Sequence, residues 1–421
     1  MSTIPPAEWH GTVTVIVPTH DRPASLVRLL RSLAADGTPP PYEVLVVADG
    51  CTGETEHVVA AQAFPFPVRV IEQRPARGPA MARNLGAAEA RGDVLLFIDD
   101  DIEPFGDVIA EHRRLHDGRP LVVIGAPRAP RPRDAGFREL AGWAWWEQQF
   151  ERMRRPGHRF GYDDVFTGLL SVPREFWQRL GGFDPSLRCR EDFELGLRLV
   201  RLRGNFVFSE AGGGWHHENR SGDRLVRRKQ DEGSADVAIA RLHPWAFGSL
   251  PLGRGSPDPR ADVVRQIAFD WPRLGFFGVK IAERLLNVLE AMRMRGAWRR
   301  VQGGVMYFSY WHGAAAAAGG WSGMVALRKA ATMAAPPQRR VLDFDLAHDW
   351  ATLEQRLDEG RPDVLSLRIG DIPLGDVLDD PGREPLRGAH LRSPPDALVQ
   401  VLTAARAIRS LRNQSVATPV P

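Results

Sequence analysis

The chain has 421 residues, of which 43% are hydrophobic and 25% charged, with a formal net charge of +3. This length is sufficient for one large domain and an appendage, and the composition fits a soluble enzyme. Two cysteines exclude a disulfide framework, so a reducing, cytoplasmic location is expected. Residues 1–9 lack the pattern of a signal peptide, and no basic–aromatic spacing indicates a nucleic-acid partner.

The first hundred residues alternate predicted strands and helices. Strands are expected over residues 12–18, 44–47, 68–71 and 94–98. Apolar residues recur at helical spacing between them, at Leu26, Leu29, Leu30 and Leu33, and at Met81, Leu85 and Ala88. The alternation predicts a parallel sheet covered by helices, and ligands bind such sheets beyond the carboxyl ends of the strands. Six polar residues are expected to collect there: His20, Asp21, Asp49, Arg77, Asp99 and Asp101.

Three carboxylates directly follow the strand Val94–Ile98. If the strand continues, alternation brings Asp99 and Asp101 to one side and points Asp100 away. Two converging carboxylates can hold a divalent cation, and the cation can bind a diphosphate. An acidic turn or a helix cap is an equally good interpretation of this segment alone.

Six short motifs, taken together and in this order, resemble family 2 glycosyltransferases of the GT-A fold: Ile16–Pro23, Val46–Gly50, Ala82–Gly86, Phe97–Asp101, Gly181–Asp184 and Glu191–Asp192. The resemblance covers roughly residues 12–220. It implies an α/β fold, with a Rossmann-like, mostly parallel sheet flanked by helices. It also implies transfer of a sugar from a nucleotide-diphosphate donor to a sugar, lipid-linked or other hydroxyl acceptor, with inversion and with a divalent metal, Mn²⁺ or Mg²⁺.

The resemblance implies a donor site built from ten residues: Pro18, Thr19, His20, Asp21, Arg22, Asp49, Arg77, Arg83, Asp99 and Asp100. Asp49 is expected at the nucleobase, although the family often has a second acid where this chain has Ala48, which leaves the base open. Arg77 and Arg83 flank the start of a predicted helix, where positive charge suits a phosphate or ribose. Asp99 is expected on the ribose side.

The same resemblance implies that Asp192 is the catalytic base and that Glu191 orients Asp192 or the acceptor. Acids at a helix start are also common caps, which is the structural alternative. Asp101 is the expected metal ligand, together with His216 or His217, of which we favour His216. These histidines lie on a predicted flexible glycine loop, residues 211–218, that could close over the donor.

We divide the chain into a catalytic domain over residues 1–225, a helical extension, a linker and a small appended segment. The donor half is expected over about 12–125 and the acceptor half over about 126–225. The extension (226–332) contains a basic, aromatic stretch over 254–327 that fits either an ordinary helical subdomain, which we favour, or peripheral contact with the inner membrane face. Residues 303–327 are expected as a buried or interfacial helix. The other expectations are a linker at 333–340 and, within the appended segment 341–421, a hairpin at 363–378 and a frayed tail.

An acceptor loop is expected over residues 128–162, where Trp143, Trp145 and Trp146 either stack on a sugar or lipid or form a packed cluster. Other functions fit less well. The loop after the first strand lacks the glycines that a nucleotidyltransferase or a nicotinamide dehydrogenase needs. A non-catalytic nucleotide-sugar sensor would not need Asp192.

Overall fold

The computed structural model describes residues 11–35, 42–116, 121–130, 135–217, 222–256, 258–334, 339–346, 350–377 and 380–392. The expectations for residues 1–9, for the tail and for half of the linker (335–338) lie outside these segments.

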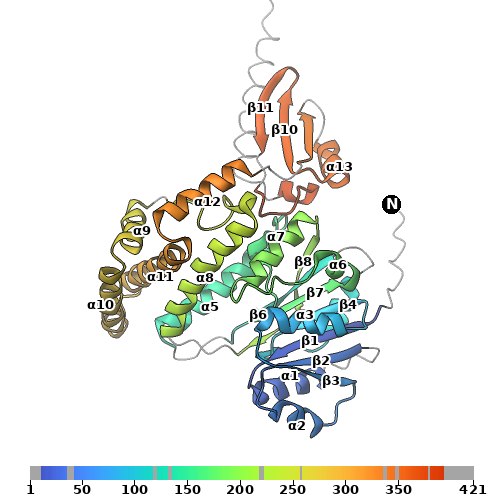
Figure 1. Ribbon diagram of the computed structural model, residues 1–421. Coiled ribbons are helices and arrows are strands. Elements are labelled where there is room, and N and C mark those ends of the chain that lie inside the picture. The colour runs from blue at the N-terminus through green and yellow to red at the C-terminus, as the bar shows by residue number, and fades with distance from the viewer. Residues whose placement is uncertain are drawn as a thin grey trace, which may run out of the picture.

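The large sheet has eight strands in the order β3-β2-β1-β4-β7-β6-β8-β5 (Figure 1). They are β1 Val13–Thr19, β2 Tyr42–Asp49, β3 Val68–Gln73, β4 Val94–Ile98, β5 Ile102–Pro104, β6 Leu121–Arg128, β7 Leu169–Pro173 and β8 Asn205–His216. The first four strands pair in parallel, whereas β7 is antiparallel to both of its neighbours. The predicted α/β class and the four predicted strands are confirmed.

Helices cover both faces of this sheet. They are α1 Pro23–Ala35, α2 Glu54–Ala60, α3 Pro79–Glu89, α4 Val108–Leu115, α5 Phe137–Arg154, α6 Arg174–Leu180 and α7 Glu191–Arg201. Alternate residues of β4 enter two cores: Val94, Leu96 and Ile98 pack with α1 and α4, while Leu95 and Phe97 pack with α3, α6 and α7. A strand buried on both faces must be apolar throughout, which explains the uninterrupted run Val94–Ile98.

The helical extension packs beside this domain (Figure 1). It consists of α8 Gly222–Leu242, α9 Pro259–Asp270, α10 Pro272–Ala291, α11 Arg295–Ala318 and α12 Trp321–Met333. The expected helix over 303–327 is interrupted at Gly319 and Gly320, which both have positive φ, and its first part is largely buried. In the part of the chain that the structure describes, no helix combines the length and the apolar composition needed to span a bilayer.

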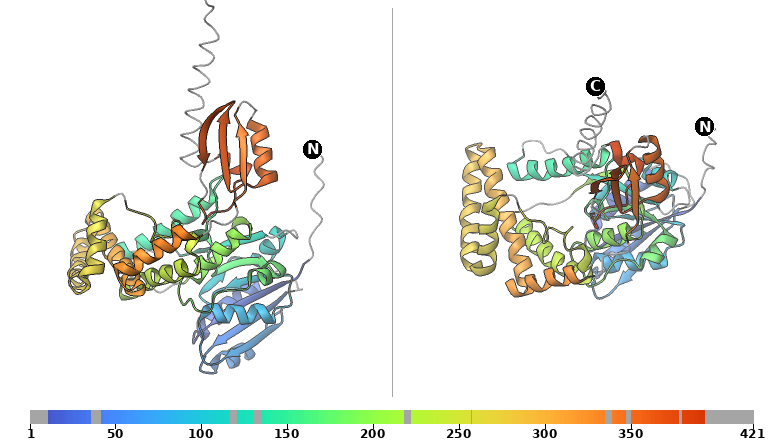
Figure 2. Two further views of the ribbon diagram at one scale, coloured as in Figure 1. Left: turned by 45° about the horizontal axis from the view of Figure 1, so that its top comes forward. Right: turned by 90° about the horizontal axis from the view of Figure 1, so that it is seen from above.

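The appended segment forms a second, three-stranded sheet, separate from the large one (Figure 2). Its elements are β9 Val341–Asp345, α13 Trp350–Gly360, β10 Val364–Ile369 and β11 Ile372–Val377. The predicted hairpin corresponds to the antiparallel pair β10 and β11. The parallel strand β9 and the crossover helix α13 were not predicted.

Two predicted loops are regular elements instead. The glycine loop over 211–218 is wrong through His216, because these residues continue β8 and pair with β5 and β6. A Cβ on Gly214 would lie 2.7 Å from Ile102 Cγ2, so the glycines allow strands to approach closely rather than providing a mobile lid. The expected acceptor loop over 128–162 is largely the helix α5.

Candidate active site

The carboxyl ends of the parallel strands are tied together by short polar contacts. Pro18 and Thr19 end β1, and His20 and Asp21 follow directly. The Nδ1 atom of His20 lies 2.5 Å from the carbonyl oxygen of Asp49, and since a carbonyl only accepts, Nδ1 carries the proton. Asp21 accepts a 2.9 Å hydrogen bond from the backbone N–H of Thr52. The loops after β1 and β2 are therefore held against each other.

Asp49 is buried and its carboxylate organises the loop between β3 and α3. One oxygen accepts from Gln73 Nε2 at 2.6 Å and from the N–H of Arg77 at 2.7 Å. The other accepts from the N–H of Gly78 at 2.7 Å. The side chain of Arg77 is exposed at this edge. Asp49 thus shapes the loop that precedes α3, and its contact with a nucleobase stays a prediction.

The three acids after β4 do not follow strand alternation, and this expectation is wrong. The strand ends at Ile98, and the N–H of Ile102 donates to the carbonyl of Asp99, which closes a turn. Because the chain turns here, Asp100 and Asp101 come together and Asp99 stands apart. Arg22 donates at 3.1 Å to each of Asp100 and Asp101.

Asp100 lies on the inner side of this turn. It is buried, and one of its oxygens accepts a 2.7 Å hydrogen bond from the hydroxyl of Thr19. Burial and the neighbouring acids raise the pKa of Asp100, while Thr19 and Arg22 oppose that rise. These contacts make Asp100 a support for the turn, and its contact with the donor stays a prediction.

Arg83 on α3 joins the donor side to the acceptor side. Its side chain is buried and donates to Asp99 at 2.6 Å and to Glu191 at 3.0 Å. Burial alone would lower the pKa of Arg83, but the two carboxylates outweigh it and keep the guanidinium charged. The guanidinium of Arg83 already binds two carboxylates. Its direct contact with a phosphate or ribose, which the sequence led us to expect, stays a prediction.

Glu191 and Asp192 begin α7, as the sequence predicts. Burial and the adjacent charge of Glu191 raise the pKa of Asp192 to about 7. One oxygen of Asp192 accepts from the N–H of Phe193 at 2.9 Å, so it also satisfies a free donor at the helix start. Capping and base chemistry are therefore compatible in this residue.

His216 ends β8, His217 follows it, and their side chains lie next to different acids. The Nε2 atom of His216 lies 3.5 Å from Asp101, whereas Nε2 of His217 lies 2.9 Å from Glu103. Burial would raise the pKa of Asp101, but the hydrogen bond and charge of His216 and the charge of Arg22 outweigh it and lower the pKa. Of the two histidine side chains, only that of His216 therefore lies next to Asp101, the predicted metal ligand.

Asp101 and His216 would hold a divalent cation only together with further ligands from the substrate and water. Across the described segments, no group of three or more His, Cys, Asp or Glu side chains is arranged to hold a metal ion. The two side chains supply one oxygen and one nitrogen donor, which suits Mn²⁺ better than Mg²⁺. The remaining positions would belong to diphosphate oxygens and water, as is usual for such ions.

Trp146 of α5 borders this site, and Trp145 packs against Trp146. Trp146 packs against Phe150 and Phe166, and its ring centre lies 6.2 Å from that of His216. Trp145 is half exposed. Trp146 therefore belongs to a packed cluster, and Trp145 remains a surface on which an acceptor could stack.

The contacts made by Arg190 could not be predicted from the sequence. This residue precedes Glu191 and has a positive φ of 57°. It binds Asp236 through both oxygens at 2.8 and 3.0 Å and Glu232 at 2.9 Å, both on α8. Tyr310 on α11 also donates to Asp236, at 2.6 Å. The helical extension thus holds the residue that leads into the predicted base, and no sequence motif links segments so far apart.

Comparison with known proteins relates part of this chain to a described family. Residues 14–172 match the model of the family described as glycosyl transferase family 2. These residues form a family 2 glycosyltransferase domain. An uncharacterised glycosyltransferase of Haemophilus influenzae is 29% identical over 192 residues, which cover 45% of this chain and 62% of that protein.

A second relative of the family 2 domain is a pre-mycofactocin glycosyltransferase of Mycobacterium tuberculosis. It is 26% identical over 262 residues, which cover 60% of this chain and 52% of that protein. The chain spans less than two thirds of the length of either relative. Among solved structures, a mannosyltransferase of Pyrobaculum calidifontis in complex with GDP-Man and Mn²⁺ has 17% identity and a TM-score of 0.47, covering 73% of this chain and 87% of that one.

Proposed function

We propose that this chain transfers a sugar from a nucleotide-diphosphate donor to an acceptor hydroxyl, with inversion at the anomeric carbon. The observation that carries the proposal is the ion-pair chain from Asp99 through Arg83 to Glu191. It connects the acids beyond β4, where the family 2 domain is expected to bind its donor, to the pair of acids that begins α7. One rigid contact thus relates the donor side to the proposed base.

Asp192 is the general base of this proposal. Its pKa of about 7 leaves a substantial ionised fraction at neutral pH and gives the carboxylate more basicity than an exposed aspartate has. It takes the proton of the acceptor hydroxyl as the hydroxyl oxygen bonds to the anomeric carbon and the bond to the donor diphosphate breaks. Glu191 is fixed by Arg83, so it positions Asp192 and the acceptor rather than accepting the proton.

The donor lies, in this proposal, along the edge formed by Asp49, Arg77, Asp99 and Asp101. Asp99 is assigned to the ribose, and Asp101 and His216 to a divalent cation. When bound, such a cation neutralises the negative charge that develops on the leaving diphosphate. Arg22, which is half exposed and already paired with Asp101, is close enough to add a second positive charge there.

A direct test measures the release of nucleoside diphosphate from UDP-, GDP-, dTDP- and CDP-sugars with Mn²⁺ or Mg²⁺. We expect one base to support metal-dependent turnover, and the anomeric configuration of the product, followed by NMR, to be inverted. Product with retained configuration would contradict the mechanism, because it requires a nucleophilic carboxylate that the proposal does not contain. Failure of every donor to support turnover in the presence of both metals would contradict the proposed activity.

A further inference from the structure

Helix α10 exposes a continuous row of large apolar side chains. Six of them recur every three or four residues and form the surface that we call the α10 face: Leu274, Phe277, Ile281, Leu285, Val288 and Met292. Their exposed fractions run from 42% for Leu285 to 63% for Phe277. The opposite side of α10 is also apolar, but it is buried through Val279, Leu286 and Leu289. A contiguous exposed apolar surface of this kind is uncommon on a protein whose surface contacts only solvent.

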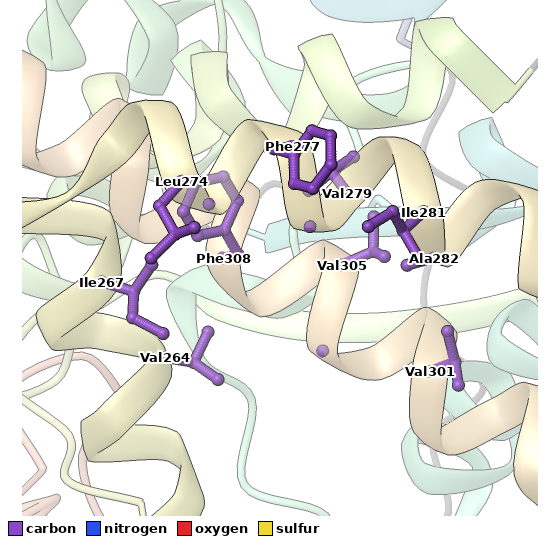
Figure 3. A pocket seen from close by; sticks show the side chains of 13 residues that line it. Val264, Ile267, Leu274, Phe277, Val279, Ile281, Ala282, Val301, Val305 and Phe308 are labelled. Atoms are coloured by element: carbon purple, nitrogen blue, oxygen red, sulfur yellow. The ribbon is translucent and has the colours of Figure 1, made fainter.

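A groove between α9, α10 and α11 continues the α10 face inward (Figure 3). It has a volume of about 480 Å³. Leu274, Phe277 and Ile281 belong to both surfaces, and Ile267 and Phe308 line the deeper part. Every lining side chain is apolar, so the groove offers no partner for a polar ligand.

Exposed basic side chains lie on α10 and on the segment that follows it. Seven exposed basic residues lie between positions 271 and 300: Arg273, Lys280, Arg284, Arg293, Arg295, Arg299 and Arg300. The same stretch contains two acids, Glu283 and Glu290, and Glu290 already accepts a hydrogen bond from the N–H of Phe137. An apolar face bordered by basic side chains complements an anionic lipid surface. The apolar side chains enter the acyl region, and the basic side chains contact the negatively charged headgroups.

We propose that the α10 face docks on an anionic lipid bilayer. The helix lies at the outer end of the extension, away from the large sheet, in both views of Figure 2. The side chains of the row are 42–63% exposed, so no other described element covers it. The partner is therefore a surface with negatively charged headgroups and an apolar layer beneath them.

The position of α5 relates this surface to the candidate active site. Phe137 at the start of α5 packs edge-on against Trp298 of α11, with ring centres 5.9 Å apart. Nine residues further along the same helix, about 14 Å at the usual helical rise, Trp146 lies beside His216. A docked α10 face would hold the site close to the headgroup layer. This placement favours a lipid-linked acceptor, a consequence that rests on the proposed transfer.

Vesicle sedimentation tests the docking. We expect the full chain to bind vesicles of phosphatidylcholine with phosphatidylglycerol, to bind pure phosphatidylcholine weakly, and to be released by high salt. The double variant Ile281→Glu/Leu285→Glu should lose at least about tenfold in affinity, because two apolar side chains no longer enter the bilayer. Val341→Glu is the matched control: it is 62% exposed on the small sheet and should bind as the wild type does.

Three results would overturn the inference. They are the absence of binding to anionic vesicles at low salt, undiminished binding by the double variant, and a dimer in light scattering that the double variant abolishes while vesicles are ignored. All three substituted side chains are exposed, so thermal unfolding should be unchanged and a folding defect is recognised separately. Vesicle binding requires neither donor nor turnover, so its failure and a failure of the proposed transfer are distinguishable.

Discussion

The guanidinium of Arg83 donates to the carboxylate of Glu191 at 3.0 Å, across 108 positions of sequence. The two residues lie on α3 and at the start of α7, on opposite sides of the proposed reaction. Since Arg83 is buried and the side chain of Glu191 is only 12% exposed, their contact relates the strand-end acids to the helix that carries Asp192.

Arg83→Gln should destabilise the protein by about 2–3 kcal/mol, because it leaves two carboxylates without their shared cation. Donor affinity should also fall, since Asp99 is no longer oriented. Chemical unfolding and calorimetry with nucleoside diphosphates measure the two effects. Arg69→Gln is the control: its pairs with Glu43 and Glu89 are more exposed, so it should cost less than about 1 kcal/mol. Equal losses in both variants would argue against a special role for Arg83.

Asp192→Asn should lower the rate of transfer by about two to four orders of magnitude, the usual contribution of a general base. Donor affinity should stay nearly unchanged, because the substitution acts on the acceptor side. The amide oxygen can still accept from the N–H of Phe193, so the helix start is preserved. Initial rates with saturating donor and acceptor provide the measurement. An active Asp192→Asn protein would refute the assignment and leave the fold and the donor site untouched.

The pH dependence of activity should show the ionisation of Asp192. The base must be deprotonated, so kcat/KM should rise with pH and level off above about 7. Stability should change in the opposite direction. The folded state binds this proton more tightly than the unfolded state, whose ordinary value is 3.8, so this contribution to stability falls as pH rises from about 4 to about 7. A kcat/KM profile that is flat through this range would contradict the prediction.

His216→Ala and Asp101→Asn should each remove the metal-dependent part of nucleoside diphosphate binding, by at least about tenfold. His217→Ala should retain it, because the imidazole of His217 is paired with Glu103. The backbone N–H of His217, which donates to the carbonyl of Asp101, is unaffected by that change. Calorimetry with and without Mn²⁺ separates the three variants. Similar losses for the two histidines would mean that neither is the specific ligand.

Gly214→Ala should destabilise the protein by about 1–3 kcal/mol and weaken metal-dependent binding. A Cβ there would lie 2.7 Å from Ile102 Cγ2 and 2.8 Å from the carbonyl oxygen of Glu103, so β5 and β8 must separate close to His216. Gly106→Ala is the matched control, since a Cβ at that position meets no atom within 4 Å. Thermal unfolding compares the two. If Gly214 tolerates alanine as well as Gly106 does, the close strand packing is not what requires glycine.

The sequence alone predicted the first four strands of the large sheet and the helices α1 and α3, although it did not predict α2 or β5. The apolar run Val94–Ile98 and the spacing of Leu26, Leu29, Leu30 and Leu33 predict a strand and a helix that the structure confirms. The ordered motifs also predicted the family correctly. These properties are local, because periodicity and short motifs depend on neighbours a few residues away.

Local patterns failed where packing decides the conformation. Three consecutive glycines predict a flexible loop, yet in this chain they lie in β8, because neighbouring strands approach too closely for a side chain. In the same way, alternation could not place Asp99 and Asp101, because β4 ends at Ile98, directly before Asp99. The turn that follows is held by the contacts of Asp101 with Arg22 and of Asp99 with Gly168.

The chemistry of the candidate site was decided by tertiary structure alone. The sequence nominated Asp192, but its raised pKa depends on burial beside Glu191 in the folded chain. It proposed two histidines, and only the fold brings His216 rather than His217 to Asp101. Residue types can be read from the chain, but a pKa or a pair of ligands depends on distances between segments about a hundred residues apart, which exist only once the sheet and its helices have packed.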